Sequence, residues 1–209
     1  GSGLTLAARA GAVLGDIEFV QFHPTAMALG VDPMPLATEA LRGEGAVLVN
    51  EKGERFMADI AGAELAPRDV VARAVWREIA RGGQAWLDTR KALGASIASR
   101  FPSVTALCRR SGLDPVSEAI PVRPAAHYHM GGVAVDERGR SSVSGLWACG
   151  EAAATGLHGA NRRASNSLLE GLAYAGWIAQ DILGVAAGRP ARPVMLDSPS
   201  GQEGDDSTV

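Results

Sequence analysis

Residues 158–171, HGANRRASNSLLEG, place two adjacent arginines directly before a run of small polar residues. Within this run Ser167 and Glu170 have the spacing of a capping box, in which the serine hydroxyl accepts a backbone N–H and the glutamate reaches back. The sequence therefore predicts that a helix begins at Ser167. Arg162 and Arg163 would lie beside the positive end of this helix, which disfavours each cation by roughly 0.3–1 kcal/mol. We expect a negatively charged group between the arginines and the helix.

The predicted helix runs from Ser167 to about residue 184 and has one apolar face. Side chains at helical spacing form this face, so we expect it to be buried, against a sheet. They are Leu168, Leu169, Leu172, Ala175, Ile178, Ala179, Ile182 and Leu183.

The composition is that of a soluble globular protein, with 209 residues, 46% hydrophobic and 21% charged. A net charge of −3 provides no basic surface for nucleic acid. No apolar run approaches the roughly 20 residues of a membrane helix, and the start does not resemble a signal peptide. Cys108 and Cys149 are far apart in sequence, which favours reduced thiols. We therefore expect a cytoplasmic protein with no nucleic-acid or membrane partner.

Turn residues and apolar spacing divide the remaining chain into short elements of both kinds. Helices are expected over residues 4–14, 67–80 and 91–112, the last broken at Pro102; strands over 17–22, 46–50, 55–57, 85–88, 121–123, 132–135 and 145–149; and a loop over 31–35. The fold class is α+β.

The order of these elements indicates two structural units. Residues 24–122 would form an α+β lobe, inserted in part of an α/β domain to which residues 1–23 and 123–187 belong. Residues 188–209 are rich in Pro, Ser, Gly and Asp and are expected to be a disordered tail.

All four histidines lie beside Gly, Pro or small residues at predicted strand ends and loops, where functional sites are usually built. They are His23, His127, His129 and His158. Each could also be a loop histidine without a function. His127 and His129 could place two metal ligands on one side of a strand, but no cysteine or carboxylate lies at a companion spacing. We therefore expect no metal.

Charged residues near two predicted helix starts have two interpretations. Arg68 follows Pro67 in a first turn, where it is either a surface arginine paired with Asp69 or a side chain that points into a cleft. Glu39 and Arg42 are three residues apart and form either a surface ion pair or, in a cleft, a path for protons.

The arginines suggest the class of substrate. Arg68, Arg162 and Arg163 offer forked donors that match carboxylate groups, and histidines and hydroxyls accompany them. This set suits a small dianion, so we predict a dicarboxylate substrate.

Several stretches, in order and at matching spacing, resemble the succinate dehydrogenase and fumarate reductase flavoprotein family. They are QFHPT (21–25), TEALRGEG (38–45), LAPRD (65–69), AHYHMGG (126–132), TGLHGANR (155–162) and ASNSLLE (164–170). The resemblance covers residues 4–184, and the wording of LAPRD and ASNS favours the branch that oxidises L-aspartate. It implies that residues 24–122 are a capping lobe on the substrate side of an FAD-binding domain.

The resemblance also implies roles for individual residues. Arg68 would be the acid/base residue, with Glu39 and Arg42 relaying protons. The substrate carboxylates would be held by His23, Thr38, Glu39, His127 and Arg162. FAD would contact Ser2, Glu151, Ser165, Ser167 and Leu168, with Glu151 at the ribityl or ribose hydroxyls and the 167–168 backbone at the flavin pyrimidine edge. The implied reaction is hydride transfer from L-aspartate to FAD at the start of NAD biosynthesis, with fumarate as a further dicarboxylate ligand and quinolinate synthase as a partner.

Departures from the family pattern leave alternatives open. The Gly-x-Gly-x-x-Gly turn that opens the FAD domain and the C-terminal helical domain are not in this sequence. We therefore expect the middle third of a longer protein, which by itself is inactive and binds FAD weakly or not at all. Ser2 replaces an aspartate, either as a substitution or as a cloning remnant, and Arg163 and His129 are atypical. The alternatives are a succinate or fumarate enzyme subunit and a non-catalytic capping-lobe fragment.

Overall fold

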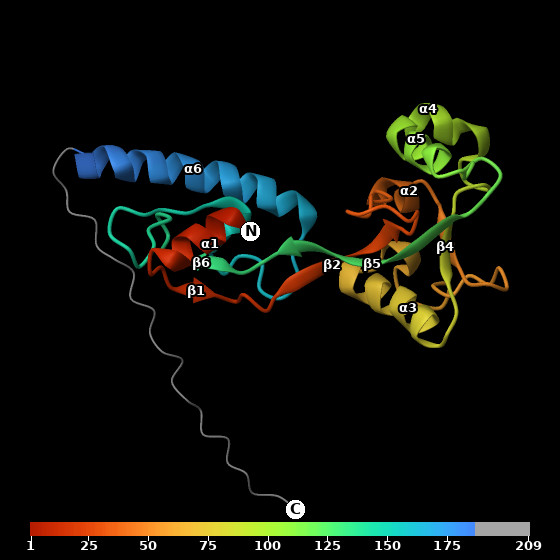
Figure 1. The fold of residues 1–209 in the computed structure, drawn as a ribbon, viewed down its shortest axis with the longest axis horizontal. Coiled ribbons are helices and arrows are strands. Elements are labelled where there is room, and N and C mark those ends of the chain that lie inside the picture. The colour runs from red at the N-terminus through yellow and green to blue at the C-terminus, as the bar shows by residue number, and fades with distance from the viewer. Residues whose placement is uncertain (187–209) are drawn as a thin grey trace, which may run out of the picture. The chain divides into compact units, whose positions relative to one another are not determined.

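The computed structural model describes residues 1–186, which form two compact units (Figure 1). Residues 20–128 form the central unit, and residues 1–19 together with 129–186 form the terminal unit. The segment expected as an inserted lobe, 24–122, lies within the central unit. Its identification as a substrate-side capping lobe remains a prediction. The expected tail, 188–209, lies outside the described residues.

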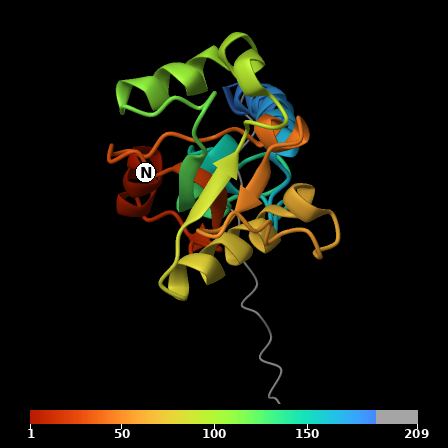
Figure 2. The same ribbon diagram turned by 90° about the vertical axis from the view of Figure 1, so that its right-hand side faces the viewer.

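The central unit is built on a four-stranded sheet with strand order β2-β5-β4-β3. Its elements in chain order are β2 (Val20–Met27), α2 (Glu39–Gly43), β3 (Val47–Val49), η1 (Ala63–Leu65), α3 (Arg68–Ala80), β4 (Ala85–Asp88), η2 (Gly94–Ser96), α4 (Ile97–Arg100), α5 (Pro102–Arg110) and β5 (Ile120–His129). Strand β4 pairs antiparallel with β3 and with β5. Helix α3 lies on one side of this sheet and the α4–α5 pair on the other (Figures 1 and 2).

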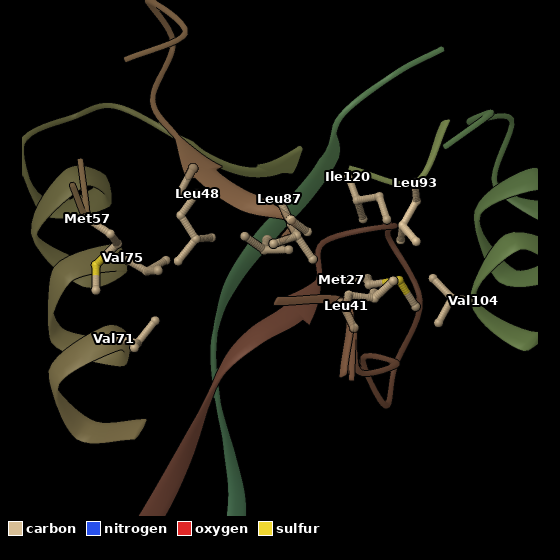
Figure 3. Packing of buried hydrophobic residues seen from close by; sticks show 14 of the residues in the cluster. Met27, Leu41, Leu48, Met57, Val71, Val75, Leu87, Leu93, Val104 and Ile120 are labelled. Carbon is tan, nitrogen blue, oxygen red and sulfur yellow. The ribbon is translucent and has the colours of Figure 1, made fainter. Parts of the chain in front are cut away.

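A row of apolar side chains crosses the sheet and forms the centre of the core. Leu87 on β4 lies opposite Leu48 on β3 and Ile120 on β5, and all three are fully buried. Figure 3 shows the helices packing onto this row, with Val75 of α3 and Val104 of α5 approaching from different sides. The row holds the strands in a register that fixes which of their residues face the functional cluster described below.

The terminal unit contains a small three-stranded sheet and two helices. Its elements are α1 (Ser2–Arg9), β1 (Leu14–Gly15), β6 (Gly132–Ala134), η3 (Gly150–Ala152), β7 (Ala153–Ala154) and α6 (Ala164–Ala186). Strand β6 pairs antiparallel with β1 and parallel with β7. A Cβ at Gly131 would lie 2.0 Å from the Asp16 carbonyl oxygen, and one at Gly132 would lie 2.4 Å from the Ala152 oxygen. Only glycine allows such close approach of the backbones.

Several predicted elements are confirmed. The predicted helix 67–80 is α3, the strand 85–88 is β4, and the break at Pro102 separates α4 from α5. The turn after Asn50 is also present, but the predicted strand 55–57 is reduced to a bridge between Val49 and Arg55. On its other edge, β3 pairs along its length with β4.

Other predicted elements are wrong in extent. The predicted helix 4–14 is shorter and begins earlier, as α1. Strand β2 starts at Val20 and continues through Pro24 to Met27, because the Thr25 carbonyl accepts from Ala37 N and the Thr25 N–H is satisfied by the His23 ring. The predicted strand 145–149 is limited to a bridge between Arg140 and Trp147.

Helix α6 differs from the prediction in both its start and its surroundings. It begins at Ala164, three residues before Ser167. The described residues do not cover its predicted apolar face, since Leu168 is 76% exposed and Leu172 is 73% exposed. The sheet of the terminal unit has two- and three-residue strands and is too small to cover a helix of 23 residues.

Candidate functional site

Four basic side chains and one carboxylate meet in the central unit. We call His23, Glu39, Arg42, Arg68 and His127 the central cluster. They come from β2, α2, α3 and β5, so residues distant in the sequence are brought together by the sheet and the helix packed on it. The His23 and His127 rings stand edge to face, with centroids 5.2 Å apart.

Arg68 is held at two points. Its Nε donates to Glu39 Oε2 at 3.0 Å, and its Nη1 donates to Gln21 Oε1 at 3.4 Å. The Arg68 side chain is 14% exposed, whereas the Glu39 side chain is 49% exposed. The Arg68–Glu39 pair therefore links a mostly buried guanidinium to a carboxylate that solvent can reach. Arg68 thus contacts Glu39 and Gln21, and Asp69 pairs with Arg73 on the same helix.

Arg42 is buried with part of its hydrogen-bonding capacity unused. Its Nη1 donates to the Glu64 backbone carbonyl, and its Nη2 lies 3.8 Å from Glu39 Oε2. Within residues 1–186, its Nε and Nη2 have no hydrogen-bond acceptor. A buried donor without an acceptor is costly, so this guanidinium favours the arrival of an anion.

The electrostatic environment keeps His23 uncharged. Burial, with further contributions from Arg68, His127 and Arg42, lowers the pKa of His23 from 6.5 to about 3. At neutral pH His23 is therefore a neutral ring, and because its Nδ1 accepts from Thr25 N, its Nε2 carries the proton and can donate one hydrogen bond. Burial also lowers the pKa of Arg42, and Arg68 adds to this effect against the opposing influence of Glu39 and Glu64. A bound dianion would relieve this repulsion.

Thr38 lies immediately before α2 and acts as its cap. The Thr38 hydroxyl accepts from Ala40 N at 3.4 Å, so it fixes the start of the short helix that carries Glu39 and Arg42. Its role in holding a substrate carboxylate remains a prediction, as do the roles of the central cluster.

Two residues that hold the central cluster, Gln21 and Glu64, were not predicted from the sequence. Gln21 alternates with His23 along β2, and residues two apart on a strand face the same side, so period-two spacing could have identified it. Glu64 is buried and holds Arg42 through its carbonyl. Nothing in the sequence near Glu64 signals this contact.

The terminal unit contains the residues that were predicted to contact FAD. Ser165, Ser167 and Leu168 lie near the start of α6, whose first turn carries no acidic side chain. Arg162 donates from Nε to the Ser167 hydroxyl at 3.0 Å, and that hydroxyl donates to the Ala164 carbonyl at 3.0 Å. Ser167 therefore lies inside the helix, and the prediction that it caps the helix is wrong.

Glu170 explains why the predicted capping box does not form. Its side chain is 1% exposed and accepts from the Thr155 hydroxyl and from His158 Nε2, the latter at 2.7 Å. The carboxylate is thus directed toward the 155–158 loop rather than back toward Ser167. His158, one of the four candidate histidines, is a structural partner of this buried acid.

The donors at the start of α6 fit the carbonyl-rich edge of a flavin. The first backbone N–H groups of a helix lack partners within the helix and favour electron-rich groups. Element η3, which carries Glu151, packs against α6. Glu151 is exposed, and its Oε1 accepts from His129 N at 3.0 Å, which leaves Oε2 for a ribityl or ribose hydroxyl. Ser2 is exposed in the first turn of α1. The residues present therefore fit FAD, although each individual contact remains a prediction.

Both ring nitrogens of His129 lie within hydrogen-bonding distance of backbone carbonyl oxygens. Its Nδ1 lies 2.8 Å from the Gly131 carbonyl oxygen and its Nε2 lies 2.9 Å from the Ile17 carbonyl oxygen. This ring joins the end of β5 to the segment before β2. In the part of the chain that the structure describes, no group of histidines, cysteines and carboxylates could hold a metal ion. The described helices also include none long and apolar enough to cross a membrane.

Comparison with known proteins confirms the family resemblance. The chain is 65% identical over 191 residues to an L-aspartate oxidase of Agrobacterium fabrum, and 63% identical over 188 residues to an L-aspartate oxidase of Mesorhizobium japonicum. These matches cover 91% and 90% of the chain but 36% and 37% of the relatives. The chain thus spans little more than a third of the length of these curated relatives.

A solved structure shows the same arrangement of elements. The FrdA chain of Escherichia coli quinol fumarate reductase matches with a TM-score of 0.80 and 36% identity, over 89% of this chain and 35% of that one. The described residues are therefore a mixed α+β fragment that corresponds to part of such a flavoprotein. The family model described as "FAD binding domain" matches residues 1–168, and the chain belongs to this FAD-binding family.

Proposed function

We propose that the full-length protein oxidises L-aspartate to iminoaspartate with FAD as the electron acceptor, the first step of NAD biosynthesis. The observation that carries this proposal is the central cluster, in which two guanidinium groups and two histidines surround one carboxylate and a buried arginine keeps two donors without acceptors. Such a cluster suits a small dicarboxylate. The 65% identity to a named L-aspartate oxidase favours aspartate among the dicarboxylates.

In this proposal the central cluster holds the substrate. Arg68, with its fork oriented by Glu39 and Gln21, binds one carboxylate of the dianion. His23 and His127 provide further hydrogen bonds from the adjacent strands. The family resemblance assigns Arg162 and Thr38 to the same task. Fixed orientation of the bound dianion is the main contribution that the protein can make to the rate.

In this proposal the two arginines and Glu39 transfer the proton. Oxidation of the amine removes a hydride from the α-carbon and a proton from the nitrogen. Arg68 Nε contacts Glu39, which is near Arg42 and half exposed, so Glu39 connects the mostly buried arginines to solvent. Arg68 is thus the proposed acid/base residue, with Glu39 and Arg42 as the relay.

FAD, when bound, supplies the hydride acceptor. On the protein side, the amides at the start of α6 near Ser165, Ser167 and Leu168 would bind its electron-rich edge, and Glu151 would bind a hydroxyl. These donors favour the extra negative charge that builds up on reduction.

The experiment that tests the proposal is turnover of L-aspartate and of succinate by the purified full-length protein. We expect flavin reduction by L-aspartate and little by succinate. The second candidate is a succinate or fumarate enzyme, which is favoured by the fold match to a fumarate reductase. Preference for succinate, or reduction of fumarate alone, would establish that candidate. A full-length protein that retains flavin but converts none of these compounds would be the non-catalytic alternative.

The proposal also includes a partner enzyme and a cellular location. Iminoaspartate is an imine and hydrolyses in water, so an enzyme that consumes it, quinolinate synthase, is the proposed partner. We also propose a cytoplasmic location.

A further inference from the structure

Glu64 is a buried acid that the proposed chemistry does not use. Its side chain is 4% exposed. Its Oε1 accepts from Leu48 N on β3 at 3.1 Å and from Arg55 Nε at 2.9 Å, while its Oε2 accepts from Arg55 Nη2 at 2.5 Å. The Arg55 side chain is 45% exposed, so the pair extends from the interior to the surface. The carboxylate thus ties η1 to β3 and to the turn that follows it.

The backbone of Glu64 faces the central cluster. Its carbonyl accepts from Arg42 Nη1, and among the described residues this is the one hydrogen bond of the Arg42 guanidinium. The position of the Arg42 side chain therefore depends on where η1 lies. Four residues after Glu64 the chain reaches Arg68, by way of the buried Ala66 and Pro67, which precedes α3. Both arginines of the cluster are consequently connected to η1.

We propose that Glu64 is a positioning residue for the Arg42–Glu39–Arg68 group, and that its two-point pair with Arg55 sets the geometry of proton transfer. The expected effects on kcat and on the isotope effect rest on the proposed function. A forked arginine–carboxylate pair fixes orientation as well as distance. Movement of η1 would shift the carbonyl that holds Arg42 and the start of the helix that carries Arg68.

The bidentate geometry distinguishes positioning from simple stabilisation. A buried ion pair is often no more stabilising than well-packed apolar side chains of similar volume. An apolar residue at position 64 could therefore fill the space, but it could not bind Leu48 N and Arg55 at the same time. The hydrogen bond that holds Arg42 is made by the backbone of Glu64, so the position of the guanidinium follows the placement of η1.

The test uses Glu64→Gln and Arg55→Gln in the full-length protein. Glu64→Gln keeps the volume of the side chain but replaces one carboxylate oxygen, an acceptor, by an amide nitrogen. Arg55→Gln breaks the same ion pair at its half-exposed partner, where a substitution disturbs folding least. We expect kcat with L-aspartate to fall roughly 10- to 100-fold, the scale of a misplacement of about 1 Å. KM should stay within about twofold, because Arg68, His23 and His127 still bind the dianion. The solvent deuterium isotope effect on kcat should rise as proton transfer becomes slower.

Asp88→Asn is the matched control. Asp88 also forms a two-point pair with an arginine, Arg90, whose side chain is 48% exposed, but this pair contacts no residue of the central cluster. We expect Asp88→Asn to leave kcat and the isotope effect unchanged. Arg55→Lys keeps the charge but loses the fork and should fall between Arg55→Gln and the unmodified protein.

Two results would overturn the inference. One is kcat within about twofold of the unmodified protein in both Gln variants. The other is a lowered melting temperature and a lower kcat with an unaltered isotope effect, as expected for a purely structural residue. If the unmodified protein does not oxidise L-aspartate, the proposed function fails by itself. The crystal structure of Glu64→Gln then decides: displacement of the Arg42 guanidinium from the carbonyl of residue 64 supports the inference, and an unchanged contact refutes it.

Discussion

The contacts of Arg68 show which of its two predicted environments, the surface or a cleft, it occupies. At the start of α3 it could have been a surface residue paired with Asp69. Instead it bonds to Glu39 and Gln21, which lie 29 and 47 residues away in the chain. A long-range pair of this kind is formed by the packing of α3 on β2. Arg68 is therefore a member of the central cluster and not an isolated surface charge.

Replacement of Arg68 by leucine should abolish turnover of L-aspartate in the full-length protein. The change removes the proposed acid/base group and one carboxylate ligand, while flavin is expected to remain bound because its predicted contacts lie in the terminal unit. Steady-state turnover and flavin absorbance measure the two effects. Arg73→Leu on the same helix is the control, since the Arg73 side chain is 71% exposed. Near-normal turnover of Arg68→Leu would remove this residue from the mechanism.

His23 should remain uncharged down to a pH of about 3 in the absence of substrate. Because its pKa is lowered relative to the unfolded chain, it contributes stability that is fully present above pH 6.5 and is lost as the pH falls toward 3. A dicarboxylate should raise this pKa by neutralising the neighbouring cations. NMR titration of the His23 ring with and without succinate measures both effects. A titration midpoint near 6.5 without ligand would contradict the burial of this ring among cations.

At the scale of elements, helix α6 is anchored at two points by buried acids. Near its start Glu170 binds Thr155 and His158, and near its end Asp181 binds Arg140 and the Trp147 indole N–H. Both acids direct the helix onto loops rather than onto a large sheet. Helix α6 is thus held in the terminal unit by polar contacts while its leucines stay exposed.

The Asp181 anchor should make the terminal unit sensitive to acid. Hydrogen bonds from Arg140, supported by Trp147 against the opposing effect of burial, lower the pKa of Asp181 from 3.8 to about 2. A lowered pKa of an acid stabilises the fold above its ordinary value, and this contribution disappears as the pH falls from about 4 to about 2. Chemical denaturation across this range should show that the free energy of unfolding of Asp181→Asn depends less steeply on pH. Equal slopes in Asp181→Asn and in the unmodified protein would exclude the anchor.

At the scale of the whole molecule, the chain corresponds to 36% of an L-aspartate oxidase of Agrobacterium fabrum and to 35% of a fumarate reductase flavoprotein. The Gly-x-Gly-x-x-Gly turn that binds the pyrophosphate in many dinucleotide domains is not in this sequence. The residues that fit the flavin, near Glu151 and the start of α6, are present. Cofactor binding is therefore expected to draw on more of the protein than these residues.

The 209-residue chain by itself should retain FAD more weakly than the full-length protein. The physical reason is that the amides of α6 and Glu151 contact only part of so large a ligand. Gel filtration with added FAD, followed by visible absorbance, compares the two proteins. Stoichiometric, tightly held flavin on the chain alone would show that its own residues suffice.

Local patterns in the sequence were enough to predict elements with their own start and stop signals. Helix α3 follows Pro67 and ends before Gly82-Gly83, and β4 is a short apolar run between turns, so both were predicted to within one residue. The residues of the central cluster were also identified, largely through a family resemblance of short motifs. The predicted pairing of Ser167 with Glu170 was wrong, because the Glu170 carboxylate binds the His158 ring instead. The capping-box pattern considers only residues at the helix start and does not include such a partner.

The mixed α+β class and the family could be predicted from the sequence, because periodicity, turn residues and short motifs are properties of neighbouring positions. The dicarboxylate-binding character of the site stays a prediction. The tertiary structure alone decided that Gln21 and Glu39 hold Arg68, that the Glu64 carbonyl holds Arg42, and that Asp181 anchors α6. These contacts join residues 22 to 47 positions apart. Buried donors and acceptors need hydrogen-bond partners, and the folded structure determines which groups lie close enough to provide them. The spacing of residues along the chain does not show which groups these are.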